Sequence, residues 1–495
     1  MPEAPSVLPG LAVLLPLAGA AFVVLAGRWP NARESMSIGA ALATFGVVAA
    51  MLPGVVDGEV RTAKLVELAP GVDVALRADA AGMIFATLAS FLWVLTAVYS
   101  IGYMRGHAEQ NQTRFYAAFA LSISATLGVA LAGNLLTFVV FYELLTLFTY
   151  PLIVHRQSAG AIRVGRKYLA YTLSGGLALI AGTAWVYTLG MDGSFTPGGF
   201  LDDARLSDGT LWGLLALLMT GVSVKAAVMP AHGWLVGAMV APTPVTALLH
   251  AVAVVKAGVF GVVRVMVFVF GASLLNDMGA GQIIAAIAAV TVVLGSVLAL
   301  RHDNLKRRLA YSTISHLSYI VLGVALLGPL ALTGALLHLV GHGVTKITLF
   351  FCAGAIDVHT HRENVSEMGG IGRQMPITMA AFTLASLSMA GIPPFVIFGS
   401  KWLLGSGAAQ VDQTAYLIVY MVSGVLSAAY LFPIVYRAYW RPSVNFPRFS
   451  EAPVLMVAPL SLTALLALAW GLVPDLPFSF LSLATSVADA MDGAK

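Results

Sequence analysis

The chain has 495 residues, of which 59% are hydrophobic and only 10% are charged. A soluble chain carries about a quarter charged residues, so this composition excludes an ordinary soluble enzyme and indicates a membrane protein. The formal net charge of +4 is small. Cys352 is the only cysteine, which excludes a disulfide framework, a cysteine-based zinc site and protein-held iron–sulfur clusters.

Apolar stretches of roughly twenty residues, the length that crosses a hydrocarbon core of about 30 Å, recur along the chain. A helix satisfies the backbone hydrogen bonds in lipid, and long unbroken apolar runs exclude an outer-membrane barrel. The sequence therefore predicts an all-α membrane protein without a soluble domain. The fourteen expected spans are residues 7–27, 36–53, 80–104, 114–132, 134–154, 167–189, 211–230, 243–271, 282–300, 309–328, 331–356, 375–405, 413–436 and 454–473.

The loops between these stretches alternate in charge. Every clearly basic loop follows an odd-numbered span, whereas the opposite loops, such as 57–79 and 192–208, are acidic or neutral. The positive-inside rule then places both termini on the non-cytoplasmic side of a bacterial inner membrane. The basic loop residues include Arg28, Arg105, Arg156, Arg163, Arg301, Lys306, Arg362, Arg437 and Arg448.

Five ionisable residues fall well inside the expected spans, one acid and four lysines. A charge at the bilayer centre costs about 2.5–3.5 kcal/mol on insertion scales. The five charges are therefore expected to face one another, water or the interior of the bundle. They are Glu143, Lys225, Lys256, Lys346 and Lys401.

Histidines accompany these charges. His338, His342 and Lys346 recur every four residues, so they share one face of a helix. His250 and Lys256 share a span, but a six-residue separation places them on different faces of a regular helix. Lysine, glutamate and histidine that are buried beside one another can load and release protons near neutral pH. The pattern predicts a proton relay.

Simpler readings apply to single members of this set. A lone intramembrane histidine such as His250 is often a packed or hydrogen-bonded residue, and Lys256 or Lys401 can extend toward the membrane surface. The spacing of His338 and His342 is compatible with metal binding, but a third ligand would have to come from elsewhere, and Lys346 repels a cation. We therefore expect no metal site and no cofactor.

Two of the expected spans contain prolines beside a lysine. Pro230 follows Lys225, and Pro393 and Pro394 precede Lys401. Proline removes a backbone donor, so these helices are expected to break where a polar cavity satisfies the freed groups. Interrupted helices in corresponding halves of a chain are typical of an inverted-repeat transporter.

Four motifs resemble the antiporter-like subunits shared by Mrp sodium/proton antiporters, membrane-bound hydrogenases and respiratory complex I. The resemblance runs from about residue 80 to 436. The motifs are MVAPTPVTALLHAVAVVKAGVF (239–260), LKRRLAYSTISHLSYI (305–320), HLVGHGVTKITLFFCAG (338–354) and GIPPFVIFGSKWL (391–403).

The resemblance implies roles for the intramembrane residues. Glu143 matches the fifth-helix glutamate that pairs with the seventh-helix lysine, here Lys225. His250 and Lys256 match connecting residues of the eighth helix, and Lys401 matches an exit residue of the twelfth. The central relay of the eleventh helix corresponds to His338, His342 and Lys346.

The resemblance also implies two inverted five-helix repeats. The expected divisions are residues 1–104, with helices 1–3; 105–272, the first repeat; 273–436, the second repeat; and 437–495, with helix 14 and a short C-terminal tail. Two departures leave the helix breaks open, because Val236 stands where relatives usually have proline, and Val396-Ile397 where they often have glycine. Within the family the sequence is most similar to the D-type subunit of Mrp antiporters and to its hydrogenase counterpart.

These observations predict the proton-translocating subunit of a multi-subunit cation/proton antiporter, with Na⁺ as the expected cation. Its expected partners are other membrane subunits and the lipid bilayer, with no nucleic acid. A proton-pumping subunit of a redox complex remains open, as does a membrane subunit of an inorganic-carbon uptake complex. The chain is expected to be no enzyme by itself, but a translocase subunit if it belongs to a redox complex.

Overall fold

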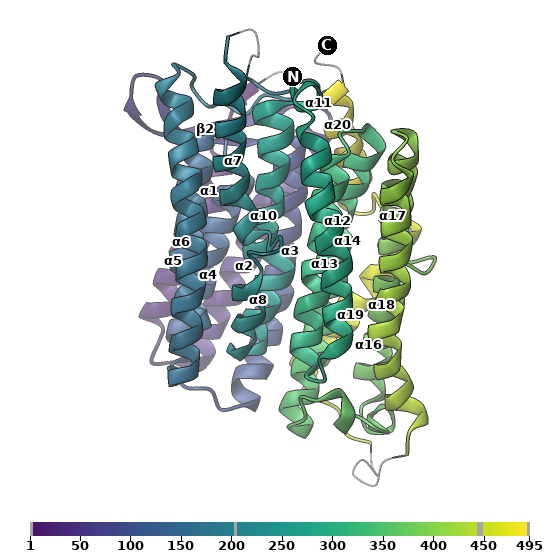
Figure 1. Ribbon diagram of the computed structural model, residues 1–495. Helices are drawn as coiled ribbons and strands as arrows, with labels where there is room; N and C mark the ends of the chain where they lie inside the picture. The colour runs from purple at the N-terminus through teal and green to yellow at the C-terminus, as the bar shows by residue number, and fades with distance from the viewer. Residues whose placement is uncertain (1–2, 202–204, 443–448, 493–495) are drawn as a thin grey trace.

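The computed structural model describes residues 3–201, 205–442 and 449–492. Long helices stand side by side and form one bundle (Figure 1). The first described residues and the C-terminal end of α20 (Phe480–Asp492) lie at the same end of this bundle (Figure 1). Arg448, one of the basic loop residues, lies outside the described residues.

In the described part of the chain, eleven helices are long and apolar enough to cross a membrane. The chain is therefore an all-α, multi-pass membrane protein, as its composition predicts. These helices are α1 (Leu8–Leu25), α2 (Pro30–Val56), α3 (Ala80–Gly106), α4 (Gln112–Ala130), α5 (Leu135–Ile153), α6 (Ala159–Thr188), the composite helix Thr243–Phe270, α12 (Ala280–Arg301), α14 (Pro329–Thr360), α18 (Thr414–Trp440) and α19 (Val454–Leu472).

The other three expected spans fall on shorter or more polar helices. Residues 211–230 correspond to α7 (Asp208–Lys225), residues 309–328 to α13 (Leu305–Ala325), and residues 375–405 to two helices, α16 (Pro376–Ala390) and α17 (Val396–Gln410). The number fourteen therefore stays a prediction.

Both expected interruptions are present. α7 ends at Lys225, and the chain resumes as α8 (Gly233–Gly237) and the 3₁₀ turn η1 (Ala238–Val240). α16 is followed by Gly391, whose φ of +85° is the left-handed conformation that favours glycine after a helix. α17 begins after Pro393 and Pro394, so each interruption lies within a few residues of a lysine, either Lys225 or Lys401.

The span expected at 243–271 is a composite of four segments. It consists of α9 (Thr243–Ala247), the π-helix η2 (Leu248–Val252), α10 (Val254–Val263) and a second π-helix, η3 (Arg264–Phe270). The expectation that His250 and Lys256 lie on different faces assumed a regular helix. This span is not regular, so the expectation does not apply. π-helical turns inside α-helices are frequent at functional sites.

A small sheet, not predicted from the sequence, lies at one end of the bundle. β1 (Glu3–Pro5) pairs in parallel with β2 (Val60–Ala69), which pairs antiparallel with β3 (Val72–Ala78). The sheet fills the loop expected at residues 57–79 and is a small addition to the all-α bundle. Its alternating residues were too few to stand out beside the apolar helices.

Short elements complete the chain. They are α11 (Ala272–Asp277), the 3₁₀ turn η4 (Val365–Glu367) and α15 (Ile371–Gln374). The segment expected to be a short C-terminal tail instead forms α20, whose apolar side packs on α3 and α14. Phe478 and Phe480 lie against Trp470, with ring centroids 5.9 and 5.2 Å from its ring.

Candidate functional site

Lys225 lies at the C-terminal end of α7 with its ammonium group directed at α5. Its Nζ donates a hydrogen bond to the carbonyl oxygen of Tyr142 and lies 3.5 Å from the centroid of the Tyr142 ring. The side chain is buried. Because the last carbonyls of a helix are electronegative, a lysine is favourable at this helix end.

Glu143 follows Tyr142 on α5 and is partly buried. Its Oε1 has no hydrogen-bond partner among the described residues, and no ion pair within 4.0 Å joins it to Lys225 there. A Cβ at Gly176 of α6 would collide with both carboxylate oxygens. The structure brings glutamate and lysine to the same place, with the lysine held by a backbone carbonyl.

Lys256 of α10 connects the first half of the chain to the second. Its Nζ donates to the carbonyl oxygen of Leu339 at 2.7 Å and lies 3.0 Å from His342 Nδ1. Both side chains are fully buried. The contact places an ammonium and an imidazole within the distance of direct proton transfer.

A second hydrogen-bonded group surrounds His338 of α14. His338 Nε2 lies 3.1 Å from Nδ1 of His316 on α13, and His338 Nδ1 lies 2.9 Å from Ser400 Oγ on α17. The two imidazole rings are stacked with centroids 5.3 Å apart. His316 Nε2 continues to Ser427 Oγ of α18 at 3.3 Å. Four helices therefore meet in one buried polar chain.

Lys346 and Lys401 end in different surroundings. Lys346 is fully buried and donates to Ser312 Oγ of α13. Lys401 Nζ donates to the carbonyl oxygens of Met389 and Ala390, at 3.0 and 3.1 Å. These are the carbonyls freed where α16 ends, so the helix interruption provides the binding site of the lysine. A cavity of about 750 Å³ opens beside Lys401.

His250 is not hydrogen-bonded to Lys256. Neither of its ring nitrogens has a partner among the described residues, although the ring is fully buried. The ring packs on Phe350 of α14 with centroids 4.8 Å apart. Phe350 lies one helical turn from Lys346, so His250 belongs to the surroundings of the central lysine.

The structure contains a buried ion pair that sequence reasoning missed. Arg264 of η3 donates from Nη1 and Nη2 to the two oxygens of Asp79, at 2.6 and 2.9 Å. Three phenylalanine rings surround the guanidinium, with centroids 4.6–4.9 Å away. Arg264 lies toward the end of the expected span 243–271. It is therefore a further charge inside an expected span, in addition to the five named from the sequence.

The sequence matches the family described as "NADH:quinone oxidoreductase/Mrp antiporter, TM" over residues 132–427. Residues 69–116 match a second family, "NADH-Ubiquinone oxidoreductase (complex I), chain 5 N-terminus". The first match covers more than half of the chain. The chain belongs to this antiporter-like family.

Curated relatives of the family come from both antiporters and respiratory enzymes. A probable K(+)/H(+) antiporter protein of Rhizobium meliloti, named as its A/B subunit, is 33% identical over 93% of this chain. The N subunit of the NADH-quinone oxidoreductase of Desulforudis audaxviator is 32% identical over 78% of this chain. The alignments cover 46% of the first relative and 76% of the second, so the chain spans about half the length of the antiporter protein.

Solved structures show the same fold. A chain of the "Structure of Mrp complex from Dietzia sp. DQ12-45-1b" superposes with a TM-score of 0.85 at 23% identity, covering 97% of this chain and 96% of that one. A chain of the archaeal membrane-bound sulfane sulfur reductase also gives 0.85, at 22% identity and 99% coverage of both chains. At these identities the likeness establishes the architecture of this family member.

Several polar partners in this antiporter-like chain were not predicted. His316 stands in the motif at 305–320, but the predicted relay did not include it. Its place at i+4 from Ser312, inside an expected span, was the available signal. Ser400 and Ser427 carry no comparable signal, because serine is common in membrane helices.

The histidines of this family member are not arranged as metal ligands. Within residues 3–201, 205–442 and 449–492, no cluster of three or more histidine, cysteine, aspartate or glutamate side chains is arranged to hold a metal ion. His338 and His342 bind other side chains, namely His316 and Lys256. These histidines act as hydrogen-bonding groups in this structure.

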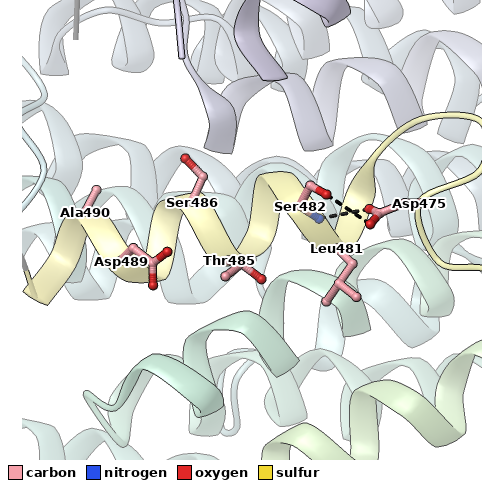
Figure 2. Close-up of a pocket in the computed structure, with 7 residues that line it drawn as sticks. All are labelled: Asp475, Leu481, Ser482, Thr485, Ser486, Asp489 and Ala490. Atoms are coloured by element: carbon pink, nitrogen blue, oxygen red, sulfur yellow. Dashed lines mark hydrogen bonds between the residues drawn. The ribbon is translucent and has the colours of Figure 1, made fainter. Parts of the chain in front are cut away.

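A recess of about 620 Å³ lies apart from the buried polar chain, on the outer side of α20. Figure 2 shows Asp475 accepting two hydrogen bonds from Ser482, from its backbone N and its Oγ, both at 2.9 Å. Thr485, Ser486 and Asp489 also line this recess; in the view of Figure 2, Ser486 extends above the helix and Thr485 and Asp489 extend below it. This recess contributes nothing to the lysine and histidine contacts described above.

Proposed function

We propose that the chain is the proton-translocating subunit of a multi-subunit cation/proton antiporter of Mrp type. The observation that carries the proposal is a row of buried basic groups joined by hydrogen-bond contacts. The contacts measure 2.7–3.1 Å at Lys256–Leu339, Lys256–His342 and His316–His338. A packing role explains single buried polar residues, but it does not explain several charges that are costly in a bilayer. Proton transfer requires groups that both bind and release protons at hydrogen-bond distance.

The chemistry follows from the contacts. Lys225 is held by the Tyr142 carbonyl, while Glu143 keeps one carboxylate oxygen unpaired. When either side chain moves slightly, Lys225 exchanges its hydrogen bond to the Tyr142 carbonyl for one to the Glu143 carboxylate. The negative charge of the carboxylate favours the charged form of the lysine. The return movement removes that support, and the lysine releases its proton toward Lys256 and His342. Exchange between these two arrangements couples the relay to an ion gradient.

The two halves of the chain support an inverted-repeat arrangement. We assign residues 105–272 and 273–436 to the two repeats, preceded by residues 1–104 and followed by 437–495. Each proposed repeat has an interrupted helix beside a lysine, Lys225 in the first and Lys401 in the second. Superposition of one half on the other after a two-fold rotation in the membrane plane tests this assignment; a failure to align corresponding helices contradicts it.

Charge replacement in the relay tests the proposed activity. In everted vesicles that contain the whole assembly, Glu143→Gln and Lys225→Ala are expected to reduce cation-driven proton movement at least about tenfold, because each removes a relay group. The measurement is the decay of a ΔpH-sensitive dye signal after addition of Na⁺ or K⁺. Assembly is checked by the amount of co-purified subunits.

Glu109→Gln provides the control. Glu109 accepts a hydrogen bond from Arg156 at 2.7 Å in a loop outside the relay, so its replacement is expected to leave exchange intact. Wild-type rates in Glu143→Gln and Lys225→Ala, with normal assembly, contradict the proposal. The relatives are named for K⁺/H⁺ or for Na⁺/H⁺ exchange, so both cations belong in the assay.

A redox-driven proton pump is the second candidate. The 32% identity to the N and L subunits of NADH-quinone oxidoreductases favours it, because the same relay serves either energy source. Purification from native membranes, with identification of partners and assay of iron and nickel, separates the two. Small hydrophobic partners without metal support the antiporter, whereas iron–sulfur partners support the pump.

The orientation is proposed from the charged loops. Ion pairs at one end of the bundle, such as Arg156–Glu109 and Lys306–Glu363, join the basic loops. We assign this end to the cytoplasm and the opposite end, where β1 and the end of α20 lie, to the outer side of a bacterial inner membrane. Protease access to an N-terminal tag in intact spheroplasts tests the assignment; protection of the tag contradicts it.

A further inference from the structure

A group of buried polar side chains outside the relay lies between the basic end of the bundle and Lys346. At that end, Nε2 of His107, just after α3, lies 3.3 Å from Oδ2 of Asp357 on α14. The ring of Tyr103 follows, with its centroid 4.7 Å from the His107 ring. Both members of the pair are mostly buried. A histidine beside a carboxylate at a protein surface can accept protons from water.

Farther into the bundle the polar atoms have no partners. Tyr103 Oη, Thr243 Oγ1 and both ring nitrogens of His250 are fully buried without a hydrogen-bond partner among the described residues. An unsatisfied buried polar group costs about 1–3 kcal/mol, and native proteins contain few. Three other hydroxyls on α3, those of Ser90, Thr96 and Ser100, are bonded to carbonyls of the preceding turn, whereas that of Thr87 is also buried without a partner among the described residues. Most hydroxyls of this helix are therefore satisfied locally, and the unpaired ones are exceptions.

Three helices align these side chains. Tyr99 and Tyr103 on α3 and His107 directly after it are spaced by four residues, so they form one line along this helix. α14 packs against α3, α9 and η2, and a Cβ at Gly354 of α14 would collide with the Tyr99 hydroxyl and with Thr243. The missing side chain of Gly354 thus lets Tyr99 and Thr243 approach the same point.

The line continues to the central lysine. Tyr99 Oη donates to the carbonyl oxygen of Phe351 at 2.8 Å, and its ring stacks on the Phe351 ring at 3.9 Å. On the neighbouring residue of α14, Phe350 contacts the ring of His250. Because Phe350 lies one turn from Lys346, the line ends at the lysine that donates to Ser312.

We infer that protons pass between the basic end of the bundle and Lys346 along this line, which we call the basic-end column: His107, Asp357, Tyr103, Thr243, Tyr99 and His250. The inference rests on the proposed transport function and gives its central lysine a route to one side of the membrane. Hydroxyl and imidazole groups both donate and accept hydrogen bonds, and the carboxylate of Asp357 accepts a proton and donates it once protonated, so each member can pass a proton on. Steps longer than a hydrogen bond proceed through a water that the unpaired polar atoms bind.

Removal of one hydroxyl tests the column with a matched control. Tyr103→Phe removes a buried, unpartnered hydroxyl from the column, and Tyr116→Phe removes one from α4 outside it. Each replacement therefore removes one buried hydroxyl and breaks no hydrogen bond among the described residues. Tyr103→Phe and Asp357→Asn are expected to slow proton movement in vesicles of the assembly about tenfold or more. Tyr116→Phe is expected to retain the wild-type rate.

The same vesicles distinguish the inference from the proposed function. If Glu143→Gln abolishes exchange while Tyr103→Phe and Asp357→Asn keep the wild-type rate, the column is overturned and the function stands. If Glu143→Gln also keeps the wild-type rate, the proposed function itself fails. Equal slowing by Tyr103→Phe and Tyr116→Phe overturns the column as well.

Thiol labelling tests the column without any transport assay. In a Cys352→Ala background, Thr243→Cys is compared with Thr183→Cys, because both threonines are buried and have unpartnered hydroxyls. A membrane-impermeant thiol reagent reacts with the thiolate, which requires water. Thr243→Cys is expected to react at least about tenfold faster, and only from the basic end. Equal rates, or reaction from the opposite end, overturn the inference.

Discussion

At the residue scale, the position of Glu143 depends on a neighbour that has no side chain. Gly176 of α6 lies against the carboxylate, and the carbonyl oxygen of the adjacent residue, Tyr142, holds Lys225. The separation between glutamate and lysine is therefore set by packing as well as by charge. An added methyl group at position 176 changes the packing around Glu143 without altering the charge of Glu143 or Lys225.

Gly176→Ala is expected to displace the Glu143 carboxylate and to lower exchange in vesicles about tenfold, because misplacement of a reacting group by about 1 Å costs up to about a hundredfold. Glu143→Asp is one methylene shorter and relieves the collision. The double variant is therefore expected to exchange faster than Gly176→Ala alone.

The control for this prediction lies on the same helix. Around Gly160, the Cβ of an alanine would approach no atom closer than 3.9 Å, so Gly160→Ala is expected to leave exchange unchanged. A wild-type rate in Gly176→Ala would show that Glu143 does not depend on this contact. Equal loss in both glycine variants points to a general effect on α6.

At the element scale, interrupted and π-helical segments bring the functional groups together. The end of α16 frees the carbonyls that bind Lys401, and η2 turns His250 toward Phe350 instead of Lys256. A regular helix would satisfy those carbonyls and would place His250 on another face. The irregular backbone is tolerated in a membrane because it is buried in protein.

The ion pair between Arg264 and Asp79 fastens η3 to the start of α3. Asp79 also caps α3 by accepting a hydrogen bond from Gly82 N at 2.7 Å. Arg264→Met leaves an uncompensated buried carboxylate and is expected to lower the free energy of unfolding by about 3–5 kcal/mol. Thermal unfolding of the purified assembly in detergent measures this loss.

Two comparisons make the ion-pair prediction specific. Arg264→Met with Asp79→Leu removes both charges and is expected to recover most of the loss, apart from about 1 kcal/mol for the helix cap. Glu67→Gln removes an exposed partner of Lys64 and is expected to change stability by less than about 1 kcal/mol. An unaltered unfolding temperature in Arg264→Met would contradict a stabilising role.

At the scale of the whole molecule, α20 covers the bundle where α3 and α14 meet. Its buried side includes Leu483 and Ala484, whereas Thr485 is exposed. The basic-end column and the relay share α14, so the packing around this helix bears on both. The apolar side of α20 is thus part of the core that fixes their positions.

Leu483→Asp is expected to prevent stable assembly, because it places an unpaired carboxylate in an apolar contact at a cost of several kcal/mol. Thr485→Asp places the same group on the exposed side and is expected to assemble normally. The amount of complex recovered after mild detergent extraction measures both. Equal recovery would show that the contact of α20 is dispensable.

Much of the architecture could be predicted from the sequence. Apolar stretches of membrane-spanning length indicated the bundle, and prolines beside Lys225 and Lys401 indicated the interruptions. Residue spacing placed His338, His342 and Lys346 on one face, where the structure has them. The sheet and α20 were missed because short or amphipathic segments give weak patterns beside long apolar helices.

The sequence by itself determined which residues are too polar for the membrane, because hydropathy and helical periodicity are local properties. Only the tertiary structure decided their partners: His316 for His338, Lys256 for His342, and the Tyr142 carbonyl instead of Glu143 for Lys225. These contacts join residues far apart in the chain. They depend on how helices pack and where their backbones break, which no local pattern records.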